Sequence, residues 1–424
     1  MNCESSLSLM SAMAINLYGT VYFKDALAGT LEQIPDGRYA FTYDPAYIEA
    51  GQPQIAHTLS RRFAPHYSPG LHPFFDNLVA EGWLARAQAR ALGIRGDDRF
   101  ARLLAFGEDC AGAVSIRDPR PARTPDLDVG TREEIAALAN RASISGVQRK
   151  LLAVHSAHGF RPAAAGELST HIAKLPSLSL GELVELEYLT TVATSTLLPD
   201  DVVVELEIAE VENIQGRCLL VRRFDRTPSG DKVHFEEFNQ LLDRPADAKY
   251  EGSYGEMAMF ILRHQPYHRE EDVDRLFRRI LVCILLGNND AHMKNFGLLY
   301  TAEGSRLAPF YDVVAAALYP EYKGSLALRL GAGKNPLDLA SLGPKHLSAL
   351  AESFELGPNA LKLAAADLNR RLPVAMRAIE ESAHGSKALK EKLIEFMRKR
   401  WNGTFNSIGK QSRKKHDDEG RRGA

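Results

Sequence analysis

An uninterrupted stretch of seven apolar residues, as long as any in the chain, runs from Ile280 to Leu286 and ends at Gly287. A helix needs about 20 apolar residues to cross a bilayer, so this short stretch must instead be buried by the fold of the chain itself. Apolar residues at helical spacing extend the pattern back to Val273, and a polar segment follows immediately. The sequence therefore predicts a core helix over 273–286 that ends directly at a polar loop.

The composition and the cysteine pattern restrict the class of protein. The chain has 424 residues, of which 45% are hydrophobic and 25% charged, as in ordinary globular proteins. Its formal net charge of -2 argues against coating nucleic acid or a membrane surface by bulk charge. The cysteines (Cys3, Cys110, Cys218 and Cys283) form no C-x-x-C pair, and no secretory signal accompanies them. We therefore expect reduced thiols in a cytoplasmic protein, and we exclude collagen, coiled-coil, disulfide-rich and transmembrane classes.

Strand, helix and turn signals divide the chain into four predicted parts: 14–125, 136–225, 226–408 and 409–424. The first is an αβ module, the second is rich in strands, the third is mostly helical, and the last is a basic tail that we expect to be disordered, as are residues 1–12. A tethered nucleic-acid contact is the alternative reading of the tail. A stretch with three prolines at 118–132 is predicted to be a linker. Strands are predicted at 15–23, 37–43, 148–154, 169–175, 201–207 and 218–224. Helices are predicted at 72–91, 183–198, 273–286, 343–355 and 361–380.

The polar segment Gly287–Phe296 combines a carboxylate, an imidazole, an ammonium and several amides. Within it, Asp290 and Asn295 have the D-x-x-x-x-N spacing of a protein-kinase catalytic loop, in which the aspartate accepts the substrate proton and the asparagine holds magnesium. Asp312 follows seventeen residues after Asn295, where a second metal-binding carboxylate would lie. Alone, this spacing is weak, because a polar loop whose aspartate caps a helix would show it equally well.

Other features follow in the order that a kinase requires. Lys174 ends an alternating strand, and Glu187 lies thirteen residues later on the next predicted helix, so the pair resembles a phosphate-binding lysine and its orienting carboxylate. A turn of small residues around Gly146 precedes that lysine, and its backbone N–H groups could cradle phosphates. The strand end Arg222–Phe224 stands where a kinase hinge would meet adenine. The agreement in order is stronger than any single match.

Together these motifs resemble the HipA family of serine/threonine kinase toxins from bacterial toxin–antitoxin systems. The resemblance covers about residues 14–400. The segments that carry it are Ser143–Lys150, His171–Pro176, Arg223–Arg226, Lys249–Glu251, Asn289–Phe296, Pro309–Asp312 and, near the N-terminus, Pro73–Leu78 with Glu81–Trp83. The resemblance implies an α+β, bilobal protein-kinase-like fold with an additional N-terminal subdomain and a mostly α-helical C-terminal lobe.

The resemblance also implies a role for each matching residue. Asp290 would be the catalytic base, and Asn295 and Asp312 would bind Mg²⁺. ATP would be bound by the phosphate loop, the strand lysine, the hinge stretch and the catalytic-loop side chains: Ser145, Gly146, Val147, Gln148, Arg149, Lys150, Lys174, Arg222, Arg223, Phe224, Asp225, His292, Lys294 and Asn295. Backbone groups of Arg222 to Phe224 would meet adenine, and Asp225 would reach the ribose. Family members inactivate themselves by phosphorylating a phosphate-loop serine, which here is either Ser143 or Ser145.

The implied activity is ATP-dependent phosphorylation of a protein, with an aminoacyl-tRNA synthetase as the substrate class. The implied partner is a small helix-turn-helix antitoxin of the HipB type, which would provide most of the contact with operator DNA, and no membrane is involved. Two other classes stay open. One is a non-catalytic nucleotide-binding corepressor that binds the antitoxin. The other is a small-molecule phosphotransferase, which would use the same D-x-x-x-x-N spacing of catalytic aspartate and metal-binding asparagine.

Overall fold

The computed structural model describes residues 17–120, 126, 130–144, 146, 148–322, 324–331 and 333–408. The predicted disorder at 1–12 and in the tail 409–424 lies outside the described residues, as do Ser145, Val147 and most of the predicted linker.

The N-terminal module is built on an antiparallel sheet. In spatial order its strands are β4 (His66–Ser68), β3 (Tyr39–Tyr43), β2 (Ala26–Gln33), β1 (Tyr18–Phe23) and β5 (Val114–Arg117). The sequence predicted β1 and β3 but missed the central strand β2, whose small residues give little strand signal. Gly29 shows why they are small: a Cβ there would lie 2.2 Å from the carbonyl oxygen of Thr42 on β3, so the strands could not approach as they do.

The helices of this part are short and one prediction among them is wrong. They are α1 (Pro45–Glu49), α2 (Pro73–Asp76), α3 (Gly82–Leu92), α4 (Arg99–Phe106) and α5 (Arg132–Ala139). The single helix predicted over 72–91 is broken at 77–81. The Asn77 side chain donates there to Pro73 O and, across the molecule, to Arg244 O, both at 2.8 Å, and α3 starts afresh after Glu81. Tertiary hydrogen bonds thus replace the continuous helix that the periodicity suggested.

A second antiparallel sheet carries the lysine strand. Its order is β7 (Gly159–Pro162), β6 (Lys150–Ser156), β8 (His171–Lys174), β10 (Arg217–Arg222) and β9 (Leu206–Glu210). The strand predicted at 201–207 is wrong in its first half. Val204 N instead donates to Phe310 O and Phe310 N to Val202 O, so this half pairs with the segment that leads to Asp312.

Helices cover both faces of this second sheet. Residues of α3, from the N-terminal module, share an apolar core with Leu151, Ala173 and Leu220 of the sheet. On the opposite face lies α6 (Leu183–Leu197), whose Val184 packs with residues of β9 and β10. The N-terminal module and the sheet are therefore joined by a common core.

The remainder is mostly helical, as predicted. Its helices are α7 (Phe238–Leu241), α8 (Tyr254–His264), α9 (Arg269–Leu286), α10 (Pro344–Ser353), α11 (Ala360–Glu381) and α12 (Lys387–Arg400). A small sheet consists of β11 (His234–Glu237), β12 (Gly297–Thr301) and β13 (Gly304–Leu307). Helix α9 contains the predicted core helix, and its residues from Leu276 to Leu286 include a long run that is fully buried. It ends at Gly287, whose φ of +83° turns the chain into the polar loop; a Cβ there would meet Phe396 at 2.6 Å.

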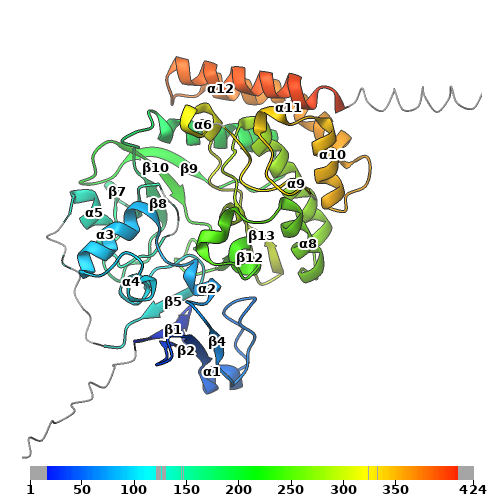
Figure 1. Cartoon of the computed structure of the whole chain (residues 1–424). Coiled ribbons are helices and arrows are strands. Elements are labelled where there is room, and N and C mark those ends of the chain that lie inside the picture. Colours follow the sequence, from blue (N-terminus) through cyan, green and yellow to red (C-terminus); the bar gives the residue numbers. More distant parts are fainter. Residues whose placement is uncertain are drawn as a thin grey trace, which may run out of the picture.

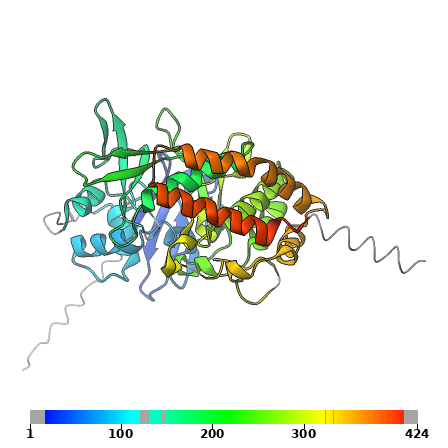
Figure 2. The same cartoon turned by 90° about the horizontal axis from the view of Figure 1, so that it is seen from above.

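Figure 1 shows the N-terminal sheet at one end of the molecule, the second sheet above it, and helices α8 to α10 on the other side. Figure 2 shows α6, α11 and α12 side by side along the top, where α11 packs on α6. The polar loop after α9 faces the second sheet across the space between the two lobes. In the described part of the chain, no helix is both long enough and apolar enough to span a membrane.

Candidate active site

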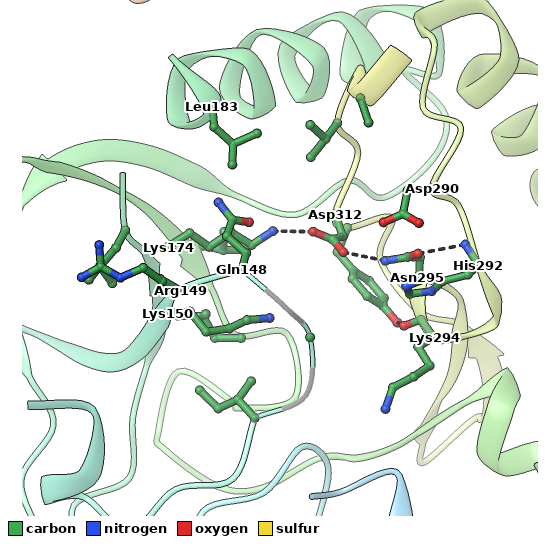
Figure 3. A pocket seen from close by; sticks show the side chains of 18 of the residues that line it. Gln148, Arg149, Lys150, Lys174, Leu183, Asp290, His292, Lys294, Asn295 and Asp312 are labelled. Atoms are coloured by element: carbon green, nitrogen blue, oxygen red, sulfur yellow. Dashed lines mark hydrogen bonds and ion pairs between the residues drawn. The ribbon is translucent and has the colours of Figure 1, made fainter. Parts of the chain in front are cut away.

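A cavity of about 560 Å³ lies between the second sheet and the helical lobe, within the usual range for small-molecule sites. Figure 3 shows Lys150 and Lys174 on one side of it, Asp290, His292 and Asn295 on the other, and Asp312 between them. Among the described residues, every predicted nucleotide-binding or metal-binding position contributes to its lining: Gly146, Gln148, Arg149, Lys150, Lys174, Arg222, Arg223, Phe224, Asp225, Asp290, His292, Lys294, Asn295 and Asp312.

The centre of the site is the buried ammonium group of Lys174. It forms an ion pair with Glu187 of α6 and another with Asp312, the latter at 2.5 Å. Burial alone would lower the pKa of this lysine, but the two carboxylates raise it well above its usual range, so the side chain is charged at neutral pH. The predicted lysine–glutamate pair therefore forms, and it reaches the predicted metal carboxylate as well.

Asp312 is held in an uncommon backbone conformation. Its φ of +59° lies in the left-handed region, which a non-glycine residue adopts only where its surroundings impose it. The paired strand segment before it and the hydrogen bond of the Thr190 hydroxyl to Val313 O fix the chain on both sides. Although burial opposes ionisation, the ammonium groups of Lys174 and Lys150 hold the pKa of Asp312 well below its usual range. Its side chain is 41% exposed, toward the cavity.

Asp290, the predicted base, accepts a hydrogen bond from the Tyr250 hydroxyl at 3.0 Å. Partial burial, reinforced by the negative charge of Asp312, raises the pKa of Asp290, although the hydrogen bond from Tyr250 lowers it. A raised carboxylate pKa is what general-base catalysis near neutral pH favours. The hydroxyl of Tyr250 thus stands where an acceptor hydroxyl would donate to the base.

The backbone of the catalytic loop is held by its own polar groups. The amide N–H of His292 donates to Asn295 Oδ1 at 3.0 Å, and Asn295 Nδ2 donates to Asp312 Oδ2 at 2.6 Å. The His292 ring packs edge-on against Tyr250 at 5.1 Å. Burial, together with the charge of Lys249, lowers the pKa of His292 to about 4, so the ring is neutral.

Gly146, in the predicted phosphate loop, lies close to Lys150 of the second sheet. Gly146 has a φ of +104°, and a Cβ on it would stand 2.5 Å from Lys150 Nζ, so this close approach requires glycine. Burial and the neighbouring charge of Lys174 lower the pKa of Lys150 to about 8. Ser143 is buried: its hydroxyl donates to Leu78 O at 2.7 Å and accepts from Ala80 N at 2.9 Å. Phosphorylation of Ser143 would require the loop to leave this position.

The predicted hinge differs from the expectation. The amide N–H groups of Arg222 and Arg223 already donate to Glu205 O and Thr170 O, both at 2.9 Å, so these two donors are not available to adenine. The carboxylate of Asp225 binds Arg223, Arg226 and the Gly112 N–H, so it is used by the protein instead of pointing freely at a ribose.

Two other predicted nucleotide contacts turn away from the cavity centre. The Arg149 guanidinium lies over the Trp83 ring, 5.4 Å from its centroid, and Figure 3 shows it directed away from Asp312. The Lys294 ammonium is bound by Glu81 at 2.9 Å and by Glu237 at 3.5 Å. The Arg149 cation thus contacts an aromatic ring on another element, and the Lys294 cation is paired with carboxylates on other elements.

The donor groups in the cavity fit magnesium and a polyphosphate. Magnesium in phosphate-transfer sites takes one or two protein carboxylates or amides and completes its shell with phosphate oxygens and water. Asp312 supplies an accessible carboxylate. Asn295 turns its amide nitrogen to that carboxylate and its amide oxygen to the His292 N–H, so its side chain would have to rotate to offer the oxygen to a metal ion. Lys150 and Lys174 supply positive charge beside them. Among the described residues no cluster of three His, Cys, Asp or Glu could hold a metal ion.

The sequence did not predict two groups of residues that line the cavity. Trp83 and Arg86 of the N-terminal module line it, and so does the segment after β8, including Leu178, which is 88% exposed. The sequence offered a signal only for the first, since Glu81–Trp83 belonged to a matching segment without an assigned role.

The protein has two lobes. One is built on the second sheet and carries Lys174, and the other is helical and carries the polar loop. This arrangement defines a kinase-like α+β protein. Comparison with solved structures supports this fold. The chain superimposes on HipA from the Shewanella oneidensis complex of HipA, HipB and operator DNA with a TM-score of 0.72, covering 92% of this chain and 99% of that one at 21% identity.

Sequence comparisons give the family. The model of the HipA-like C-terminal domain matches residues 142–376, and that of the HipA N-terminal domain matches residues 19–117. The Sinorhizobium fredii protein named "Putative kinase Y4dM" is 30% identical over 82% of this chain and 87% of its own length. The "Serine/threonine-protein kinase toxin HipA" of Shewanella oneidensis is 26% identical over 72% of this chain and 76% of its own. The chain therefore belongs to the HipA family.

Proposed function

We propose that this protein is a Mg²⁺- and ATP-dependent serine/threonine protein kinase that acts as the toxin of a toxin–antitoxin pair. The observation that carries the proposal is one arrangement: buried Glu187 pairs with Lys174, Lys174 pairs with Asp312, and Asp312 accepts from Asn295. Lys174, Asp312 and Asn295 line the same cavity as Asp290. A buried lysine, a carboxylate for the metal and a carboxylate for the base are the kinds of group that phosphoryl transfer uses, and the relatives named as kinases support the same activity.

Each residue has a defined task in the proposed reaction. Mg-ATP would supply the phosphoryl group. Lys174 and Lys150 would neutralise phosphate charge, while Asp312 and, after rotation of its amide, Asn295 would hold the magnesium ion. Asp290 would give up its hydrogen bond with Tyr250 and accept one from the incoming hydroxyl. It would then take the proton of that hydroxyl as the new O–P bond forms. The bond from the γ-phosphorus to the bridging oxygen breaks, and ADP leaves.

The acceptor and the partner follow from the family. We propose a protein hydroxyl as acceptor, with an aminoacyl-tRNA synthetase as the substrate class and the phosphate loop of this chain as a second target. The solved relative was crystallised with HipB and operator DNA. We propose an antitoxin of the same kind here, with DNA contacted mainly through it, as the near-zero net charge of this chain favours.

Incubation of the purified chain with Mg-[γ-³²P]ATP, followed by phosphate mapping, tests the proposal. Wild type should incorporate phosphate on Ser143 or Ser145, and Asp290→Ala should not, while both bind Mg-ATP. Thr58→Ala is a matched control, since Thr58 lies in the N-terminal module outside the cavity. Nucleotide binding without any transfer, in protein that was unphosphorylated at the start, would refute the kinase and support the corepressor. Transfer to a small molecule but to no protein would support the phosphotransferase.

A further inference from the structure

Glu81, at the start of α3, lies between the N-terminal module and the catalytic loop. Its Oε1 is 2.9 Å from Lys294 Nζ and its Oε2 is 3.0 Å from Lys249 Nζ, so one carboxylate bridges two ammonium groups. All three side chains are largely buried. Burial alone would raise the pKa of Glu81, but the two lysines lower it to about 2. The bridge is therefore fully charged at neutral pH.

Each of the two lysines immediately precedes a residue of the active site. Lys249 precedes Tyr250, whose hydroxyl donates to Asp290 at 3.0 Å. Lys294 precedes Asn295, whose amide donates to Asp312 at 2.6 Å. A shift in either ammonium group would therefore move its neighbour in the chain.

Other contacts limit how the two lysines could move. The backbone oxygen of Lys294 accepts from the Tyr311 hydroxyl at 2.8 Å, and its ammonium also reaches Glu237 at 3.5 Å. Lys249 lies 5.5 Å from the ring centroid of Tyr250, so its position and that of the ring are linked. Without Glu81, Lys294 would keep a carboxylate neighbour, whereas Lys249 would lose the one ion pair that the described residues give it.

We propose that Glu81 is a positioning residue through which the N-terminal module sets the geometry of both the base and the metal-binding amide. The inference rests on the proposed kinase function for its catalytic consequence. The module thus contributes to catalysis without touching the reacting atoms: Glu81 fixes Lys249 and Lys294, and these place Tyr250 and Asn295. Lys174, which would bind the phosphates, is paired with Glu187 and Asp312 instead of with Glu81.

The test compares Glu81→Gln and Glu81→Asp in the full chain. Glutamine keeps the volume and removes the charge, whereas aspartate keeps the charge and shortens the side chain. We expect Glu81→Gln to lower kcat for phosphoryl transfer by about 10- to 100-fold, the usual cost of misplaced catalytic groups, with KM for ATP within about twofold. Glu81→Asp should retain more activity than Glu81→Gln. If Glu81 served only packing, glutamine would be the milder change and the order would reverse.

Glu134→Gln is the matched control, because Glu134 forms an ion pair with Arg90 of the same helix α3 at 2.5 Å. Glutamine preserves its capping box with Thr131, so the fold should persist and kcat should stay at the wild-type value. Hydrogen exchange gives a readout that needs no activity. Glu81→Gln, but not Glu134→Gln, should accelerate exchange in peptides covering 246–252 and 288–297.

The outcomes separate the inference from the proposed function. Unchanged kcat and unchanged exchange in these peptides would overturn the role of Glu81 while the kinase stands. If wild type transfers no phosphate, the proposed function fails and the exchange measurement alone decides: selective acceleration supports the positioning role, and wild-type exchange overturns it.

Discussion

Asp109→Asn should destabilise the protein strongly, because Asp109 belongs to a buried network of four charges. Its Oδ1 accepts hydrogen bonds from Arg223 at 3.1 Å and from Arg226 at 2.5 Å, and its Oδ2 accepts from the Ser169 hydroxyl at 2.9 Å. Asp225 binds the same two arginines at 2.7 Å and 3.0 Å. The network joins the N-terminal module to the strand end that was predicted as a hinge.

The size of the effect follows from the charge balance. Two carboxylates and two guanidinium groups sum to zero, and all four side chains are between 3% and 8% exposed. Replacing Asp109 by an isosteric amide leaves one uncompensated positive charge inside the protein. Breaking a buried ion pair in this way costs about 3–5 kcal/mol of unfolding free energy. Burial and repulsion from Arg223 already lower the pKa of Arg226, and Asp225 and Asp109 both oppose this lowering.

Urea unfolding followed by circular dichroism measures this cost, with Asp36→Asn as the control. Asp36 pairs with Arg38 on the surface, where both side chains are 50% exposed, so its replacement should leave the transition midpoint unchanged. A loss of less than about 1 kcal/mol for Asp109→Asn would refute the reasoning, because it would mean that water reaches the network or that the charges are redistributed.

Three further predictions concern titration and thiol chemistry. The lowered pKa of Asp109 means that its stabilisation is complete above the pKa of the unfolded state and is lost as the pH falls through the folded value, so acid unfolding of wild type should be steeper than that of Asp109→Asn. Because Lys150 has a pKa of about 8, Mg-ATP affinity by calorimetry should weaken above pH 8, and Lys150→Met should abolish that dependence. In a Cys3→Ser background, Cys110 and Cys283, which are buried with pKa values raised to about 12, should react with Ellman's reagent only after unfolding.

The order of motifs along the chain predicted much of the site, because the site residues lie on or next to strands and helices that the sequence also predicts. Lys174 at a strand end and Glu187 on the following helix meet as expected. Asp290, Asn295 and Asp312 also face one cavity. Periodicity placed α6, α9 and α11 correctly, since each buries a long apolar face.

The features that the sequence did not reveal depend on contacts between distant segments. The break in the helix predicted at 72–91 comes from the bond of Asn77 to Arg244 O, which no local pattern reveals. The ion pair of Lys294 with Glu81 could not be predicted either, because Glu81 lies more than 200 residues earlier in the chain. The same holds for Asp225, whose partners include Gly112 of the N-terminal module. Sequence patterns identify which chemistry a segment can perform, while the partner of each charge is set by the fold.

The most direct test of the central claim is a crystal structure with Mg²⁺ and a non-hydrolysable ATP analogue. The account predicts the phosphates beside Lys150 and Lys174, the metal on Asp312 and Asn295, and the γ-phosphate facing Asp290 across the space that Tyr250 now fills. A nucleotide bound elsewhere, or bound in this cavity with its γ-phosphate directed away from Asp290, would contradict it.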